Sequence, residues 1–219
     1  RQPLTLQNSS FTNEQKPPIN RMFFLDGFLQ STSHGLSAYY EALVHPAMFA
    51  HEYPSNVAIL GAGEGAVLRE VLKHKSVTNV KLLDMDEEMV KVAKQYLPQW
   101  NDCSDLVGRA DCCLDDEITD LVYEDAFAWF TNRFDHFAPS DDEEAKDDPF
   151  DDEKFDVVIM NAIDLQYHYD YAKVEGTIET FLQSVYHSLT EKGILALELG
   201  FTPSVEDPNE EISTNRNRA

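Results

Sequence analysis

The sequence predicts an α/β protein built on an open, mostly parallel, doubly wound sheet. Short apolar runs alternate with amphipathic helical segments along most of the 219 residues. A glycine-rich turn follows the first of the buried runs, and acidic side chains follow several others. Such sheets bind ligands at the carboxyl ends of their strands, so these turns are expected to form the functional edge. The expected strands span residues 57–60, 80–84, 118–123, 155–160 and 193–199.

A strand, a glycine turn and a helix are predicted within residues 56–74, NVAILGAGEGAVLREVLKH. Gly61, Gly63 and Gly65 let the backbone approach a ligand closely and place the first N–H groups of the helix against it. The next strand ends in Asp84, at the distance of about 20 residues where an acid typically binds ribose hydroxyls. The pattern predicts a nucleoside-type ligand, and the alternative is a turn that serves only strand–helix packing.

Glu64 lies inside this turn and narrows the choice of ligand. Its carboxylate would repel a pyrophosphate, which disfavours a dinucleotide. A ligand with a cationic tail fits better, such as an S-adenosyl compound with its sulfonium and amine.

Residues 1–36 are expected to form an N-terminal arm and a β-hairpin region ahead of the nucleoside-binding domain, residues 37–219. Asp26-Gly27 lies between two apolar runs, which is the strongest short signal for a hairpin. A short strand around residues 4–6, or a loosely held arm, is expected before it.

The helical segments complete the alternation with the strands. Residues 37–50, 86–96, 126–133 and 175–190 have helical patterns. Pro46 is expected to end or kink the first of these helices.

Two polar stretches interrupt the pattern, at residues 99–117 and 139–154. The second is an acidic, low-complexity insertion and is expected to form a surface loop. The first is expected to be a polar loop and holds all three cysteines. Their odd number and the adjacency of two of them give neither a disulfide framework nor a zinc spacing, so they are interpreted as reduced thiols. They are Cys103, Cys112 and Cys113.

The balance of charged residues limits the classes of molecule that the protein is expected to bind. Lys and Arg number 17 against 40 Asp and Glu, a formal net charge of −23. This disfavours nucleic acid and anionic membrane surfaces as partners. No 18-residue apolar run and no signal-type segment are found, so a cytoplasmic protein is expected. The seven histidines show no metal-binding spacing, and no metal site is predicted.

Polar side chains converge on the expected functional edge. Glu124 and Asp125 follow the third strand, and Asn161 and Asp164 follow the fourth. Asp125 is suited to accept a hydrogen bond from an adenine amino group, whereas the alternative for each acid is a helix N-cap. Tyr167 lies in an aromatic run after Asp164, where it would line an amine site or pack under the chain.

The motifs together resemble the spermidine/spermine synthase family of aminopropyltransferases, in order and at near-family spacing from about residue 21 to 200. The motifs are LDGFLQ at 25–30, YYEALVHP at 39–46, GAGEGAVLREVLKH at 61–74, LDMD at 83–86, EDAF at 124–127 and FDVVIMNAID at 155–164. The resemblance implies a Rossmann-like class I methyltransferase fold behind an N-terminal β-region, usually in a homodimer. It implies aminopropyl transfer from decarboxylated S-adenosylmethionine, a co-substrate rather than a bound cofactor, to a di- or polyamine.

The resemblance also assigns roles in the site. Gln30 and Glu64 would lie near the sulfonium and amine of the donor, Asp84 at the ribose and Asp125 at the adenine. The expected donor-binding residues are Gln30, Gly61, Gly63, Glu64, Gly65, Asp84, Glu124 and Asp125. The expected acceptor-binding residues are Tyr39, Tyr40, Asp164 and Tyr167. Asp164 and Asn161 are the catalytic candidates.

The acceptor half departs from the family pattern. Asn161 occupies the position of the usual catalytic acid, and an amide cannot take a proton at neutral pH. Asp164 is retained, while Gly35-Leu36 replaces an acidic pair and Tyr40 replaces a Gln or His. Three interpretations remain: an aminopropyltransferase with altered acceptor choice, an S-adenosylmethionine-dependent methyltransferase, and a relative without catalysis. An acid at Glu64 favours the decarboxylated donor, whereas Asn161 argues against the family chemistry.

Overall fold

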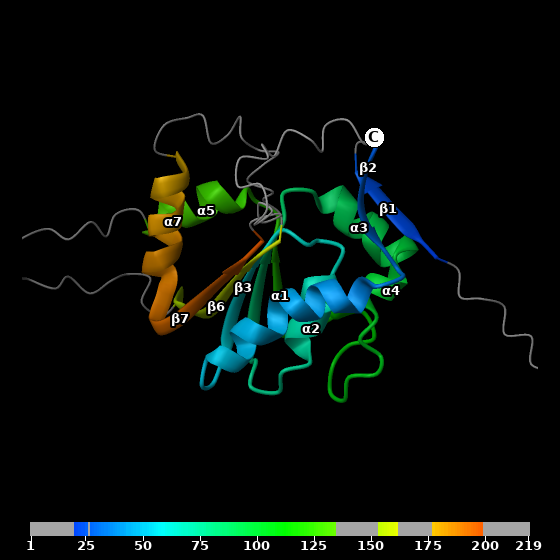
Figure 1. Cartoon of the computed structure of the whole chain (residues 1–219), viewed down its shortest axis with the longest axis horizontal. Coiled ribbons are helices and arrows are strands. Elements are labelled where there is room, and N and C mark those ends of the chain that lie inside the picture. Colours follow the sequence, from blue (N-terminus) through cyan, green and yellow to red (C-terminus); the bar gives the residue numbers. More distant parts are fainter. Residues whose placement is uncertain (1–19, 26, 135–152, 162–176, 199–219) are drawn as a thin grey trace, which may run out of the picture. The chain divides into compact units, whose positions relative to one another are not determined.

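The computed structural model describes residues 20–25, 27–134, 153–161 and 177–198 (Figure 1). Two compact units are found, Arg1–Gly35 and Leu36–Ala219. The strand expected around residues 4–6 and most of the acidic insertion lie outside the described residues.

The first unit contains an antiparallel hairpin of β1 (Met22–Leu25) and β2 (Phe28–Thr32). Gly27 follows β1 with a positive φ of 84°, a conformation that glycine adopts without steric cost. The hairpin predicted from Asp-Gly is therefore confirmed.

The second unit is built on a five-stranded sheet in the order β5-β4-β3-β6-β7, with every neighbouring pair parallel. The strands are β3 (Asn56–Leu60), β4 (Asn79–Leu83), β5 (Thr119–Val122), β6 (Phe155–Met160) and β7 (Leu189–Leu197). The order reverses at β3, so the doubly wound parallel sheet predicted from the sequence is confirmed, and β3 and β6 are its most buried strands.

Helices cover both faces of the sheet (Figure 1). Helix α1 packs against α2 and touches β6 and β7, whereas α5 packs against α7 on the opposite face. There Trp129, Phe130 and Phe181 pack in one core cluster with Leu60 and Met160. The helices are α1 (Leu36–Ala50), α2 (Ala66–Leu72), α3 (Glu87–Tyr96), α4 (Pro98–Asn101), α5 (Ala126–Phe134) and α7 (Thr177–Ser188).

Pro46 does not end α1, contrary to one of the two expectations for it. Pro46 and Ala42 are both exposed, so the carbonyl that loses its amide partner faces water. Ala47 and Met48 are buried directly after the proline and hold the last turns of the helix against the protein.

Strand β7 begins at Leu189, whereas the sequence predicted residue 193. Leu189 pairs with Phe155, and the next pair joins Ile194 to Val157, so the chain bulges between them. Gly193 fits this bulge because a Cβ there would lie 2.7 Å from Leu189 Cβ. The glycine marks the bulge and not the start of the strand.

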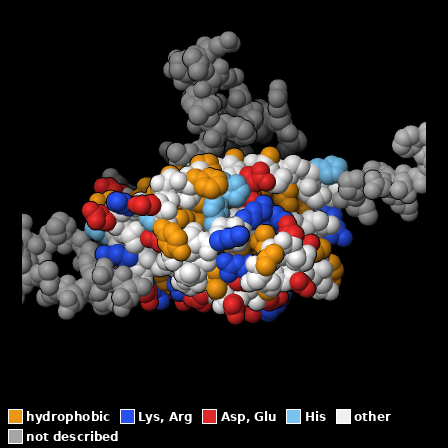
Figure 2. Space-filling model, turned by 90° about the horizontal axis from the view of Figure 1, so that it is seen from below, with side chains coloured by type: hydrophobic (Ala, Val, Ile, Leu, Met, Phe, Trp, Pro, Cys, Tyr) orange, Lys and Arg blue, Asp and Glu red, His pale blue; other side chains and the backbone are white. Residues whose placement is uncertain are grey.

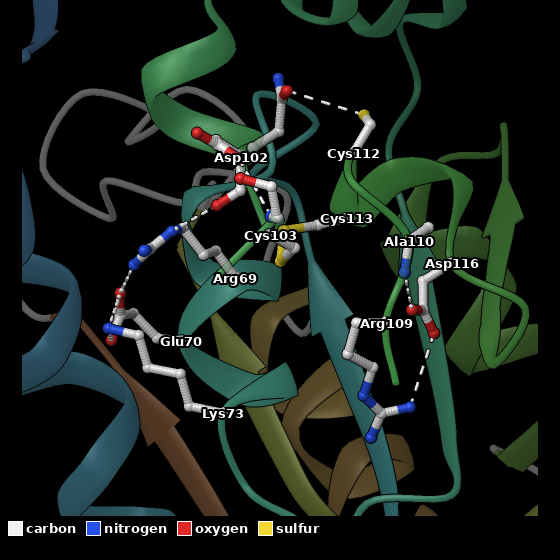
Figure 3. The surroundings of a disulfide bond; sticks show 12 residues. Arg69, Glu70, Lys73, Asp102, Cys103, Arg109, Ala110, Cys112, Cys113 and Asp116 are labelled. Atoms are coloured by element: carbon white, nitrogen blue, oxygen red, sulfur yellow. Dashed lines mark hydrogen bonds and ion pairs between the residues drawn. A yellow bond between two sulfur atoms is a disulfide. The ribbon is translucent and has the colours of Figure 1, made fainter. Parts of the chain in front are cut away.

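The interpretation of all three cysteines as reduced thiols is wrong, because Cys103 and Cys113 form a disulfide with their Cα atoms 5.3 Å apart (Figure 3). Both are fully buried, and Cys112 is free. The polar stretch that holds them is not an open loop: an isolated bridge between Asp102 and Cys112 draws its two sides together. Spacing alone could not show this pairing.

Cleavage after Arg109 by trypsin is expected to leave two peptides joined through Cys103 and Cys113 under non-reducing conditions. Cys103→Ser or Cys113→Ser should lower the free energy of unfolding by about 3 kcal/mol, as expected for a loop of this length. Cys112→Ser is the control. Separate peptides in mass spectra of thiol-blocked protein would contradict the pairing.

A histidine pair lies beside the end of α2, and Figure 2 shows histidines gathered near basic side chains on one face. His45 Nδ1 lies 3.0 Å from His74 Nε2, and His45 Nε2 lies 3.2 Å from the buried Glu70, which also pairs with Lys73. Burial and the neighbouring His45 lower the pKa of His74. The unfolded chain therefore takes up this proton first, and stability is expected to fall as the pH drops below about 6.5. Urea unfolding at pH 8 and pH 5.5 should show a smaller difference in His74→Gln, but an unchanged one in His34→Gln.

Among the described helices, none has both the length and the apolar composition needed to cross a bilayer. In the same parts of the chain, no group of three or more His, Cys, Asp or Glu side chains is arranged to hold a metal ion.

Candidate active site

The glycine turn closes the carboxyl end of β3. Gly61, Ala62 and Gly65 all have positive φ, at 74°, 69° and 93°. The Gly61 N–H donates to the Leu83 carbonyl over 2.7 Å, which ties the turn to β4. The turn therefore brings its backbone directly beside the end of the neighbouring strand.

Asp84 is hydrogen-bonded to this turn. The Gly63 N–H donates to Asp84 Oδ2 and the Asp86 N–H to Oδ1, each over 2.9 Å. Burial raises the pKa of Asp84 despite these two bonds. Each oxygen retains a lone pair for a further donor, so the carboxylate is oriented for a hydroxyl-bearing ligand.

We expect Gly63→Ala to abolish binding of the predicted nucleoside-type ligand, because the added Cβ would lie 2.7 Å from Asp84 Oδ2 and 2.8 Å from Val90 Cγ2. The first contact can be relieved only by moving the Asp84 carboxylate, and the second only by moving Val90. Gly108→Ala is the control for a strained substitution away from the turn, since its Cβ meets nothing within 4 Å although its φ is 82°. Titration with methylthioadenosine, used as a nucleoside-type probe and followed by calorimetry, measures the effect. Unchanged affinity would show that Asp84 takes no part.

Glu64 is the buried acid of the site, with a relative exposure of 6%. The Tyr40 hydroxyl donates to Glu64 Oε1 over 2.9 Å. Burial raises the pKa of Glu64, the charge of Asp84 adds to the rise, and Tyr40 opposes it. Among the described residues, no basic side chain contributes to the pKa of Glu64. A cationic ligand would therefore supply the partner that this carboxylate lacks.

Tyr39 joins the ends of two strands. Its hydroxyl donates to Glu198, the residue after β7, and lies 3.0 Å from Oδ1 of Asn161, the residue after β6. Burial and then the carboxylate of Glu198 raise the pKa of Tyr39. The rings of Tyr39 and Tyr40 pack edge to face with centroids 4.9 Å apart. The structure thus brings together Tyr39, Tyr40, Asn161 and Glu64.

Asp125 has the role that the alternative interpretation gave it. Its Oδ1 accepts from the N–H groups of Phe127 and Ala128, over 2.8 and 3.4 Å, at the start of α5. Glu124 and Asp125 are both exposed at the end of β5. Because both bonds use Oδ1, the capping role is compatible with a contact between Oδ2 and a ligand.

Three further predicted site residues belong to other parts of the chain. Gln30 lies on β2 of the first unit, and Asp164 and Tyr167 lie outside the described residues. Their roles stay predictions.

Sequence reasoning missed two residues here. Glu198 follows the last apolar run in the same way as Asp84 follows an earlier one, and that signal could have identified it. Asn101 is 2% exposed, and its Nδ2 lies 3.2 Å from the Glu64 carbonyl. It sits in a polar stretch, so no local pattern distinguishes it.

A family model described as the spermine/spermidine synthase domain matches residues 36–199. A polyamine aminopropyltransferase from Pyrobaculum aerophilum is 37% identical over 180 residues, covering 82% of this chain and 53% of the relative. Polyamine aminopropyltransferase 2 from Pseudomonas aeruginosa is 32% identical over 192 residues, covering 87% and 46%. The chain thus spans about half the length of these relatives.

Solved structures agree with the sequence matches. The spermidine synthase of Thermotoga maritima aligns with a TM-score of 0.59 and 28% identity, covering 81% of this chain and 48% of that one. A spermidine synthase in complex with the transition-state analogue AdoDATO aligns with a TM-score of 0.60 and 28% identity, covering 81% and 50%.

Proposed function

The chain belongs to the spermine/spermidine synthase family, and from this membership we propose that the protein is an aminopropyltransferase. It would move an aminopropyl group from decarboxylated S-adenosylmethionine to a di- or polyamine and release methylthioadenosine. The observation that carries the proposal is Glu64, a buried carboxylate without a cationic partner in the described chain, which lies within the glycine turn. A homodimer and a cytoplasmic location are proposed with it, supported by the family resemblance alone.

The reaction is a direct displacement. Glu64 would hold the cationic tail of the donor and Asp84 the ribose, which fixes the carbon beside the sulfonium. A neutral amine of the acceptor attacks that carbon, the C–N bond forms, and the C–S electron pair returns to sulfur. The protein contributes orientation and removal of the amine proton.

The methyltransferase alternative is not favoured. The carboxylate of S-adenosylmethionine would lie near the buried Glu64, and two like charges in such a place repel strongly. The relatives are named polyamine aminopropyltransferases. Asn161 is the observation that favours a non-catalytic relative, because the usual acid is missing there.

A turnover assay on the protein with its full natural sequence tests the proposal. Decarboxylated S-adenosylmethionine is supplied with putrescine, cadaverine, spermidine or a longer diamine, and methylthioadenosine is measured by mass spectrometry. We expect amine-dependent methylthioadenosine. A parallel reaction with S-adenosylmethionine should give no S-adenosylhomocysteine. The absence of methylthioadenosine with every amine would refute the proposal.

A further inference from the structure

We propose that Glu198 is the carboxylate that receives the acceptor amine, held in place by Tyr39 opposite Asn161. This inference rests on the proposed function, since it assigns the acceptor side of the same site. The ligand it would take is a primary ammonium group at one end of a di- or polyamine.

The first argument is the hydrogen bonding around Tyr39. A phenol has one hydrogen to donate, and a carboxylate is a stronger acceptor than an amide oxygen. The Tyr39 hydroxyl is therefore assigned to Glu198. The Asn161 atom that lies 3.0 Å from the phenol oxygen is placed as Oδ1. With the amide turned over, its nitrogen takes that place and donates to the phenol oxygen. An aspartate at position 161 could not donate, and it would place two carboxylates on one tyrosine.

The second argument is charge. Asn161 and Glu198 both contact the Tyr39 hydroxyl, and of these two side chains Glu198 carries the negative charge. The acid that is missing at the end of β6 is therefore present at the end of β7. Glu198 is exposed, and its contact in the described chain is a hydroxyl and not a basic side chain. Its charge is therefore open to a cation from solution.

The third argument is a row of contacting side chains that links two acids. Glu64 contacts Tyr40, the rings of Tyr40 and Tyr39 pack against each other, and Tyr39 contacts Glu198. One carboxylate is buried and suits the amine of the donor, whereas the other is exposed and suits an amine that enters from solvent. The aromatic rings between them are favourable neighbours for an alkylammonium chain.

The proton then has a defined path. The acceptor ammonium gives a proton to the Glu198 carboxylate and becomes a neutral amine. Its nitrogen forms the new C–N bond while the C–S bond breaks and its electron pair neutralises the sulfonium. The product leaves as a secondary ammonium, and Glu198 returns its proton to solvent.

Glu198→Gln tests the assignment, because glutamine keeps the shape and an acceptor for Tyr39 but not the charge. In the full-length protein, kcat/KM for the amine should fall about 100-fold, while the KM for the donor and the affinity for methylthioadenosine stay unchanged. Glu191→Gln, an exposed acid on β7, is the matched control. Adding Asn161→Asp to Glu198→Gln should restore at least part of the lost rate, since it returns the carboxylate across Tyr39.

An amine kcat/KM of Glu198→Gln within threefold of the Glu191→Gln control would overturn the assignment. So would a loss that falls equally on the donor KM. If the unmodified protein produces no methylthioadenosine, the proposed function fails, and calorimetric titration with spermidine then decides the assignment alone. Weaker spermidine binding in Glu198→Gln than in Glu191→Gln would support it, and equal binding would overturn it.

Discussion

Glu64→Gln is expected to weaken binding of decarboxylated S-adenosylmethionine about 10- to 100-fold, the usual effect of losing a charged hydrogen-bond partner. Glutamine retains an oxygen for the Tyr40 hydroxyl but offers no charge to the cationic tail of the donor. Affinity for methylthioadenosine, which has neither the sulfonium nor the amine, should change little. The contrast between the two ligands separates loss of charge from loss of shape.

The same change is expected to stabilise the ligand-free protein at neutral pH. Burial raises the pKa of Glu64 above its ordinary value, so the folded state binds its proton more tightly than the unfolded chain does. The folded protein should therefore gain stability as the pH falls through the raised pKa, and Glu64→Gln should lack that gain. Urea unfolding at pH 7 and pH 5 measures both effects, with Glu191→Gln as control. A variant that loses stability as well as donor affinity would show that Glu64 is structural.

The sheet could be predicted because its signals are local. Strands β3 and β6 are apolar runs that are followed by Gly61 and Asn161, and their limits need no knowledge of distant residues. The start of β7 was wrong because it depends on how Phe155 pairs across the sheet. The hydrophobic periodicity of one segment gives no information about that pairing.

The candidate site likewise has features that the sequence predicts and features that it does not. A glycine-rich turn and acids that follow buried strands can be recognised in the sequence, and they led to Gly63, Glu64 and Asp84. Contacts between residues that are distant in the sequence cannot be recognised in this way. The disulfide of Cys103 and Cys113 needs a chain reversal that brings its two ends together, and spacing does not reveal it.

Asn101 lies next to the chain reversal that the disulfide closes, and it supports the candidate site. Its Nδ2 lies 3.2 Å from the carbonyls of Glu64 and Ala93 and 3.3 Å from that of Leu97. A Cβ on Gly65 would lie 2.7 Å from Asn101 Cβ, so the turn and the asparagine fit closely. One amide thus joins the backbone of the buried acid to the end of α3.

Asn101→Asp is expected to lower the free energy of unfolding by about 2–4 kcal/mol, because it leaves buried carbonyls without a donor and places a carboxyl against them. Asn132→Asp makes the same chemical change on an exposed surface of α5 and should have little effect. Urea unfolding compares the two. In the part of the Asn101→Asp protein that remains folded, donor binding should also weaken, because the backbone of Glu64 loses the group that positions it. If stability falls while donor affinity per folded molecule is unchanged, Asn101 supports the fold without positioning Glu64.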